Sequence, residues 1–538
     1  MINLVQTNLW FFTLGLIGIT NILYKIDFGA YFIGDLIDGR LNNYILEHFY
    51  LALTNEDINF KQANFFYPTP STIMMSDSHW LLGPFYSLFR IVGFEMESSF
   101  NLIILVGCLA NFVICYYVLK KFNFSSNSSA LGAYVFAFNQ IILFKLCHMQ
   151  LNFKIFVPLA VLFCKEYFDK KDLKYISYII LCITLQLFCS PYNGSFLAFF
   201  IFIIFLFFLG YFKINEINQI YPQKYSLKIA IPLLIVSFLA LIIFGKSYLE
   251  IKNLFNRHAP ISSESYFEIR DLFTIYNSPI IDFIGKYMPL DYMERNSENS
   301  FFIGFGVLLT FIYFCTKNFY KNLNLFENIL LKSTIFMIIF FLLDKYLGTF
   351  YFLQIAIPSF ANLRASNRFF YVVFFALVYF LTLAFNKAES SNKKGMRIFF
   401  YSLAITIIAE SLFLKIIKTK IGSEKNNVES YQELMKKNGG KDSIFWFTQP
   451  KSGSIDEVNI MFAGQKQQNK SINGYSSFSP YKKNQLNSCK DAFDHLPQIE
   501  KSFSKIFAQE FKYDRDKLKI FWNKKLCTDN LKNNARAS

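Results

Sequence analysis

Two aspartates stand three residues apart, shortly after the first apolar segment of the chain. Asp35 and Asp38 belong to the hexapeptide Gly-Asp-Leu-Ile-Asp-Gly at 34–39, ahead of a run with helical periodicity. Two carboxylates at this spacing, on a turn that enters a helix, can point to one place. There they can bind a divalent cation such as Mg²⁺ or Mn²⁺, or one of them can act as a general base toward a hydroxyl group. The alternative is that Asp35 only caps the following helix.

A third aspartate and an imidazole follow further along the chain. Asp77 and His79 come after the proline-containing stretch 67–70, which predicts a rigid, extended backbone. This stretch would deliver both side chains to the start of a further helix, where they could bind substrate, and Asp77 could join the earlier pair as a third metal ligand. The alternative is again a helix cap.

Three more polar side chains are expected at the ends of membrane spans. His148 lies at the end of a hairpin between two apolar runs, where a polar side chain is costly unless it has a partner or a task. Arg364 and Arg368 are four residues apart at the mouth of another span. Guanidinium groups at that depth suit a lipid phosphate, although arginines also extend to the membrane surface without binding a ligand.

Composition places these residues in a membrane protein. The 538 residues are 53% hydrophobic and include 68 Phe, and the mean hydropathy is +0.30, which is too apolar for a soluble enzyme. The net charge of +16 does not predict nucleic-acid binding, because the basic residues fall mainly between apolar runs. The cysteines have no CxxC spacing, so no zinc site is expected.

Apolar runs of about 20 residues, enough to cross a bilayer, predict about eleven transmembrane helices. They lie at 8–25, 99–119, 127–146, 150–168, 174–190, 193–212, 228–246, 301–316, 328–347, 369–386 and 397–417. With a cytoplasmic N-terminus, the positive-inside rule is satisfied by the lysine-rich loops at 120–121, 165–174, 213–228, 317–321 and 387–397. The many Asn, Lys, Ile and Phe residues are typical of AT-rich bacteria, so we expect the bacterial inner membrane.

The predicted fold is an all-α polytopic membrane domain over 1–417 with a small periplasmic α/β domain over 418–538. The first periplasmic loop, 26–98, is acidic and contains two amphipathic helices, near 41–53 and 80–92, expected to lie on the outer membrane surface. In the tail, 443–447 and 458–462 read as strands and 499–511 as a helix. Its only cysteines, Cys489 and Cys527, could form a disulfide in an oxidising periplasm.

The ordered set of motifs resembles the C-type (GT-C) glycosyltransferase superfamily, whose multi-pass members use polyprenyl-phosphate-linked sugars. The resemblance rests on Gly-Asp-x-x-Asp at 34–38, Tyr-Pro at 67–68, Ser-Asp-x-His at 76–79, His148, Leu-Arg-x-x-x-Arg at 363–368 and Asn-Gly-Tyr-Ser at 473–476. It implies a base or metal role for the first-loop acids and a substrate-binding role for Tyr475. The acidic doublets of the better-known protein mannosyltransferases and oligosaccharyltransferases are absent.

The resemblance implies an inverting glycosyltransferase on the periplasmic face. It would transfer a hexosyl or pentosyl group from a polyprenyl-phosphate-linked donor to an envelope glycan or lipid acceptor. The alternative is a non-catalytic membrane protein for transport or assembly of lipid or polysaccharide. Transporters place ionisable residues at mid-membrane between inverted repeats. Here most candidates lie at the outer ends of the spans, which favours the enzyme.

Overall fold

The computed structural model describes residues 8–211, 222, 225–255, 266–274, 299–316, 319–361, 363–440, 442–448, 453–476, 479–481, 486 and 488–527. The described chain is mostly helical, and its contacts divide it into two compact units. Unit 1 comprises Met1–Ile33, Asn101–Phe244 and His258–Lys418. Unit 2 comprises Gly34–Phe100, Gly245–Arg257 and Thr419–Ser538, so the first predicted loop and the tail belong to the same unit.

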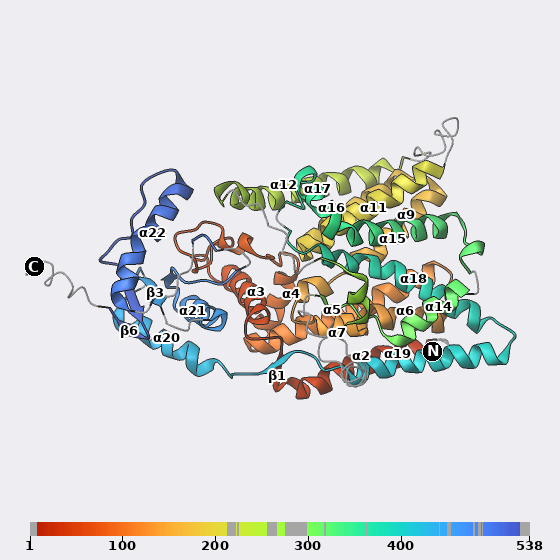
Figure 1. The fold of residues 1–538 in the computed structure, drawn as a ribbon, viewed down its shortest axis with the longest axis horizontal. Helices are drawn as coiled ribbons and strands as arrows, with labels where there is room; N and C mark the ends of the chain where they lie inside the picture. Colours follow the sequence, from red (N-terminus) through yellow and green to blue (C-terminus); the bar gives the residue numbers. More distant parts are fainter. Residues whose placement is uncertain are drawn as a thin grey trace, which may run out of the picture. The chain divides into compact units, whose positions relative to one another are not determined.

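Unit 1 is a bundle of apolar helices (Figure 1). Its helices are α2 (Leu9–Lys25), α5 (Met96–Lys121, from Asn101 onward), α6 (Ser126–Phe138), α7 (Gln140–Phe144), α8 (Met149–Asn152), α9 (Phe156–Lys170), α10 (Leu173–Cys189), α11 (Pro191–Tyr211), α12 (Leu227–Phe255, as far as Phe244), α14 (Phe305–Thr316), α15 (Leu325–Leu342), α16 (Asp344–Leu347), α17 (Thr349–Ala356), α18 (Phe370–Glu389) and α19 (Lys394–Phe413). Short 3₁₀ turns precede or connect them at Asp27–Gly29, Ile269–Phe273, Phe319–Asn322 and Ser366–Phe369, and β1 is Tyr31–Ile33.

The core of unit 1 is built around α18, whose side chains are buried on nearly all sides. It packs closely on α6, where a Cβ added to Gly132 would lie 2.1 Å from Thr382 Oγ1. Glycine at this position therefore lets the two helices approach each other. At the end of α18, Glu389 accepts hydrogen bonds from Ser125, Asn127 and Ser128 around the start of α6.

Six helices among the described residues are long and apolar enough to cross a membrane: Met96–Lys121, Pro191–Tyr211, Leu227–Phe255, Leu325–Leu342, Ser366–Glu389 and Lys394–Phe413. Three shorter apolar helices, Leu9–Lys25, Leu173–Cys189 and Phe305–Thr316, accompany them. The prediction of eleven full-length spans is not supported. Two predicted spans are interrupted: 127–146 breaks at Asn139, and the helix expected at 150–168 begins only at Phe156. Of the basic loops, 213–221, 223–224 and 317–318 lie outside the described residues.

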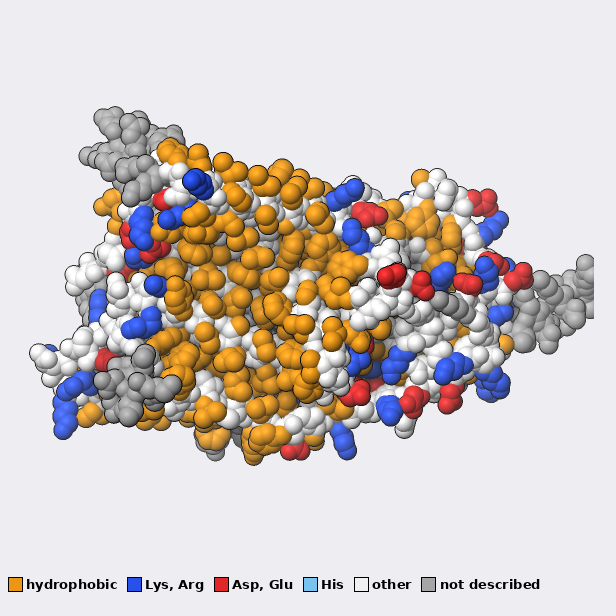
Figure 2. Space-filling model, turned by 180° about the vertical axis from the view of Figure 1, so that it is seen from behind, with side chains coloured by type: hydrophobic (Ala, Val, Ile, Leu, Met, Phe, Trp, Pro, Cys, Tyr) orange, Lys and Arg blue, Asp and Glu red, His pale blue; other side chains and the backbone are white. Residues whose placement is uncertain are grey.

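On the face drawn in Figure 2, hydrophobic side chains form one broad continuous surface that contains few charged side chains. Large apolar side chains are exposed along the helices of this bundle, as in Leu16 and Ile405, which are 65% and 67% exposed. A protein surrounded by water rarely exposes so large an apolar surface. The structure therefore supports a membrane protein.

Unit 2 combines the helices that follow the first span with the tail. Its helices are α3 (Asp38–Thr54), α4 (Leu82–Ile91), α20 (Lys425–Asn438), α21 (Ser454–Gln467) and α22 (Cys489–Phe507), with a 3₁₀ turn at Thr72–Met75. Its strands are β3 (Ile444–Thr448), β4 (Lys470–Ser471), β5 (Leu518–Trp522) and β6 (Lys525–Leu526), while β2 (Lys418–Lys420) spans the unit boundary. The sheet order is β4-β3-β5-β6, with β3 parallel to β4 and β5, and β6 antiparallel to β5.

Three details of the predicted secondary structure need correction. The segment 458–462 is not a strand but part of α21, and the last predicted helix begins earlier, at Cys489. Helix α3 is not a membrane-surface helix: Tyr44 is fully buried and packs edge-to-face on Phe462 of α21. The apolar face that suggested contact with lipid instead forms part of the core of unit 2, because the tail covers it.

Candidate functional site

Asp35 caps a helix. Its Oδ1 accepts hydrogen bonds from the backbone N–H groups of Ile37 (3.1 Å) and Gly39 (2.8 Å). Gly39 lies in the first turn of α3, where its N–H has no partner within the helix, while Ile37 is the residue before the helix. The geometry therefore gives Asp35 the role considered as the alternative from sequence, that of fixing the turn from which Asp38 projects.

Asp38 contacts a residue from the far end of the chain. The Tyr475 hydroxyl donates a hydrogen bond to Asp38 Oδ1 at 3.0 Å, and both side chains are partly exposed. The two residues belong to different motifs, 437 positions apart. The structure therefore joins the first-loop acids to the Asn-Gly-Tyr motif of the tail.

The residues before Tyr475 explain how it reaches Asp38. Asn473 binds both backbone groups of Phe447 at the end of β3, accepting from its N–H (2.7 Å) and donating to its carbonyl (2.8 Å). Gly474 then passes the Phe66 ring, where an added Cβ would lie 2.7 Å away. A larger residue would displace this backbone, so the Asn-Gly pair sets the position of the tyrosine.

His79 lies in the interior of unit 2, not on a binding surface. It is 1% exposed, and its Nε2 lies 3.0 Å from Asn42 Oδ1 on α3. Burial lowers the pKa of the imidazole to about 3, because the charged form loses its hydration. His79 is therefore a packing residue in this structure, whereas Asp77, two positions earlier, is partly exposed. The Tyr248 hydroxyl binds Ser76 and Ser78 on either side of Asp77 (3.1 Å each).

Among the described residues, no group of three or more His, Cys, Asp or Glu side chains is placed to hold a metal ion. Asp35, Asp38 and Asp77 thus do not converge as the ligand set considered for Mg²⁺ or Mn²⁺.

A partly buried ion pair that the sequence did not reveal connects α3 to α4. Arg90 donates to both Glu47 oxygens, Nε to Oε2 at 2.9 Å and Nη2 to Oε1 at 3.1 Å. The Tyr86 hydroxyl adds a third bond to Glu47 at 2.7 Å. The acidic partner lies 43 residues before the arginine, so no local pattern indicates the pair. It holds α3, the helix that begins at Asp38, to α4.

In unit 1, His148 belongs to a buried polar segment between α7 and α9, not to an exposed turn. Carboxamide side chains from three helices hold its backbone. Asn111 donates to the Asn152 carbonyl, Gln186 to the Phe153 carbonyl at 2.7 Å, and Asn193 to the Leu151 carbonyl at 2.9 Å. These bonds satisfy backbone groups inside an apolar bundle, where an unpaired carbonyl would be costly.

Arg364 and Arg368 meet the residue next to Asn193. The backbone N–H of Arg364 donates to the Tyr192 hydroxyl at 3.0 Å, and the Arg368 guanidinium carbon lies 4.4 Å from the Tyr192 ring centroid. Tyr192 and Asn193 occupy the first turn of α11. The segment containing His148 and the segment containing the two arginines are therefore attached to adjacent residues of one helix start.

Lys154 is a further cation in unit 1 that the sequence reasoning missed. It is fully buried, with its Nζ 4.4 Å from the Phe136 ring centroid and 5.0 Å from that of Phe374. Within the described part of the chain, its Nζ has no hydrogen-bond partner. Lys154 lies inside the apolar run 150–168, which the sequence predicts as a membrane span, and for this reason it is not among the predicted site residues. A lysine inside such a run is itself an indication of function.

The two cysteines of the tail, Cys489 and Cys527, form a disulfide with their Cα atoms 5.6 Å apart. The bond joins the start of α22 to the end of β6. It therefore ties the C-terminal strand pair to the helix that packs beside it in the core of unit 2.

Comparison with known proteins gives a family but no activity. No curated protein matches the chain. A family model matches residues 36–408, which is more than half of the chain and includes Asp38, His148, Arg364 and Arg368 but not Tyr475. The chain thus belongs to the family described as "Domain of unknown function (DUF6311)".

Proposed function

We propose that this protein is a membrane glycosyltransferase of GT-C type that transfers a sugar from a polyprenyl-phosphate-linked donor to an envelope glycan or lipid acceptor. It would reside in the bacterial inner membrane with its N-terminus in the cytoplasm and its C-terminal region in the periplasm. The observation that carries the proposal is the attachment of the His148 and Arg364–Arg368 segments to the first turn of α11.

This arrangement suits a phosphate group. Arg364 precedes the 3₁₀ turn at Ser366–Phe369 that leads into α18, and Arg368 lies within that turn. Tyr192 contacts both arginines and so connects them to the start of α11. Helix N-termini carry a partial positive charge and attract anions. Guanidinium groups bind phosphate oxygens through paired hydrogen bonds. During transfer they would stabilise the charge that develops on the leaving lipid phosphate.

Asp38 is the preferred general base. Tyr475 occupies its Oδ1, and the second oxygen can accept a proton. An acceptor hydroxyl would attack the anomeric carbon as the bond from that carbon to the phosphate oxygen breaks, and its proton would pass to Asp38. The sugar would be inverted, and polyprenyl phosphate would leave. Asp35 would position this carboxylate through the turn that it caps.

The proposal is tested by mass spectrometry of envelope glycans and lipid-linked sugars in a deletion strain. The strain would be complemented with wild-type, Asp38→Asn, Tyr475→Phe or Arg368→Gln protein at matched membrane abundance. Loss of a general base commonly slows a reaction by 10²–10⁴-fold, so Asp38→Asn should remove one sugar mass that wild type restores. Glu56→Gln is the matched control, because Glu56 is an exposed acid in the same loop.

The outcomes of this experiment distinguish a glycosyltransferase from a non-catalytic transport or assembly protein. A missing sugar restored by wild type and by Glu56→Gln, but not by Asp38→Asn, supports transfer and identifies the sugar. Full rescue by Asp38→Asn and Arg368→Gln would reject the proposed chemistry. The same glycan defect in the deletion strain would then favour transport or assembly of lipid or polysaccharide.

A further inference from the structure

A hollow with a basic lining lies in unit 1 where α2 and α19 both end. It is open to the surface and has a cavity volume of about 460 Å³. Three lysines line it, Lys25, Lys415 and Lys418, against one acid, Asp27. The candidate residues for sugar transfer are not part of its lining.

Helices α2 and α19, the first and last described helices of unit 1, run side by side (Figure 1). At one end the rings of Trp10 and Tyr401 lie 6.0 Å apart. Near the other end, Asn21 donates to the Ser411 carbonyl at 3.1 Å. The rise of a helix from Trp10 to Lys25 is roughly 22 Å, which accounts for most of the hydrocarbon thickness of a bilayer, about 30 Å.

The lysines differ in what they already bind. Lys25 donates to the carbonyls of Leu412 (2.7 Å) and Leu414 (2.5 Å) and thereby caps the end of α19. Lys418 donates to the Lys25 carbonyl and stacks its ammonium 4.0 Å from the Tyr31 ring centroid. Lys415 is exposed and makes no hydrogen bond or ion pair within the described residues. Lys415 and the remaining donors of Lys418 are therefore available to an anion.

The surroundings of the hollow indicate that this anion is attached to a lipid. Tyr24 and Phe413, both in its lining, are 75% and 66% exposed. Further along the same two helices, Leu16 and Ile405 are 65% and 67% exposed. Apolar side chains of this kind pack against acyl chains, while lysines and tyrosines at helix ends lie at the headgroup level. A free phosphate ion would gain nothing from the apolar surface.

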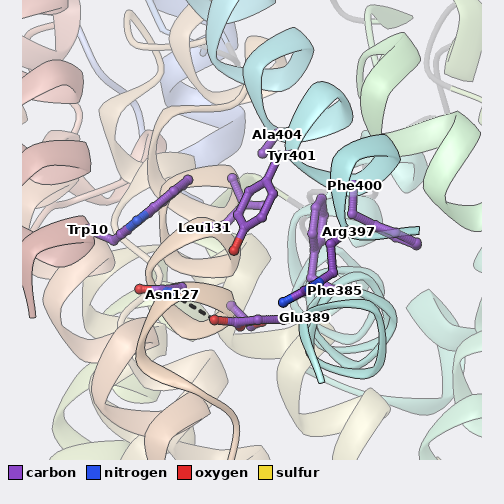
Figure 3. A pocket seen from close by; sticks show the side chains of 10 residues that line it. Trp10, Asn127, Leu131, Phe385, Glu389, Arg397, Phe400, Tyr401 and Ala404 are labelled. Atoms are coloured by element: carbon purple, nitrogen blue, oxygen red, sulfur yellow. Dashed lines mark hydrogen bonds between the residues drawn. The ribbon is translucent and has the colours of Figure 1, made fainter. Parts of the chain in front are cut away.

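A second hollow, near the opposite end of the same helix pair, provides a contrast (Figure 3). It is lined mainly by apolar side chains, and its charged side chains are one acid, Glu389, and one base, Arg397. The acid already accepts a hydrogen bond from Asn127 at 2.8 Å. Its balanced charges give no preference for an anion, unlike the three lysines at the other end.

We propose that the hollow formed by Lys25, Lys415 and Lys418 binds the headgroup of an anionic phospholipid, with the acyl chains lying along α2 and α19. Lys415 and Lys418 would contact the phosphate. Lys25 would hold the end of α19 in place and add its charge. The bound lipid would join the first and last helices of the bundle at one membrane surface.

Native mass spectrometry of the purified full-length protein tests the proposal, with phosphatidylglycerol and phosphatidylcholine titrated separately. The variant is Lys415→Gln/Lys418→Gln. The matched control is Lys393→Gln/Lys394→Gln, which removes two exposed lysines around the opposite end of α19. A lysine near an anionic lipid surface contributes ~1 kcal/mol, or about five-fold in affinity. The variant should therefore bind phosphatidylglycerol about 25-fold more weakly, and the control should bind like wild type.

Three results would overturn the proposal. One is equal binding of the two lipids by wild type, and another is the same loss of affinity in the control. The third is displacement of the lipid by millimolar glycerol phosphate, which would show a site for the free anion. Thermal unfolding of each variant distinguishes loss of the site from loss of the fold. No readout depends on sugar transfer, so the lipid site and the proposed enzyme can fail independently.

Discussion

Replacing His79 with glutamine should reduce the pH dependence of the stability of unit 2. The imidazole is 1% exposed, and burial lowers its pKa to about 3 from the ordinary value of 6.5. In the unfolded chain the same imidazole takes up a proton below pH 6.5, whereas in the folded chain it stays neutral. Its contribution to stability is therefore complete above pH 6.5 and is lost progressively as the pH falls toward 3.

The size of the effect follows from the pKa difference. Each pH unit between the two pKa values changes the free energy of unfolding by about 1.36 kcal/mol. At pH 5, about 1.5 pH units below the ordinary pKa, protonation of the imidazole in the unfolded chain lowers the free energy of unfolding by ~2 kcal/mol. Glutamine keeps an amide that can bond to Asn42 but does not titrate in this range. The variant should lose ~2 kcal/mol less stability than wild type between pH 7.5 and pH 5.

Intrinsic tryptophan fluorescence is a suitable probe for denaturant unfolding of the detergent-solubilised protein. Trp80, Trp446 and Trp522 belong to unit 2, and only Trp10 belongs to unit 1. Other groups titrate in both proteins, including His48, whose pKa burial also lowers, so the difference between the proteins isolates His79. Equal losses of stability in wild type and variant would refute the idea that His79 is buried in its neutral form.

Two further predictions concern bonds that hold unit 2 together. Replacing Cys489 and Cys527 with serine removes the cross-link between positions 38 residues apart. The free energy of unfolding should fall by about 4 kcal/mol according to the chain-entropy relation. A midpoint of denaturant unfolding unchanged from wild type would contradict this. Glu47→Gln leaves the partly exposed Arg90 guanidinium without its carboxylate partner. It should destabilise unit 2 by about 2 kcal/mol, as expected for the loss of hydrogen bonds to a charged group. A double-mutant cycle should show little further effect when Glu47→Gln is combined with Arg90→Met.

The sequence predicted the apolar character of the chain better than the lengths of its helices. Hydropathy windows average over polar residues, and Asn139 shows the consequence. Its side chain accepts from the Ile141 N–H (3.1 Å) and donates to the Ile303 carbonyl (2.8 Å), which ends one helix and begins another inside a single apolar run. The partner lies 164 residues away, so a local average cannot detect the break.

The sequence shows the amphipathic pattern of α3, but it does not show which part of the structure packs against the apolar face of this helix. A stripe of leucines and aromatic residues is equally consistent with a membrane surface and with another part of the chain. In the structure the tail covers this face through Phe462. The sequence predicts the segment that contains Phe462 as a strand, but the segment is part of α21. Short apolar runs such as 458–462 do not distinguish strand from helix.

The candidate site was predicted as a set of residues but not as a set of contacts. Asp38 and Tyr475 were selected from separate motifs, and only the fold shows that they form a hydrogen bond. His79 was selected on the same grounds as Asp77, yet their environments differ, because Asn42 and the surrounding core enclose the imidazole. Residue type and spacing can identify groups that are able to do chemistry, but tertiary burial decides which of them a substrate can reach.

The same reasoning explains why the polar residues inside the apolar helices are informative. Asn111, Gln186 and Asn193 each bind a backbone carbonyl of the segment that follows His148. A simple bundle of spans would not need them, because each helix satisfies its own backbone. Their presence means that the bundle encloses an interrupted segment, the one-turn helix α8 and the residue after it, whose carbonyls need partners from other helices. Interrupted backbone of this kind is tolerated among apolar helices where protein buries it, and residues 149–153 are all buried.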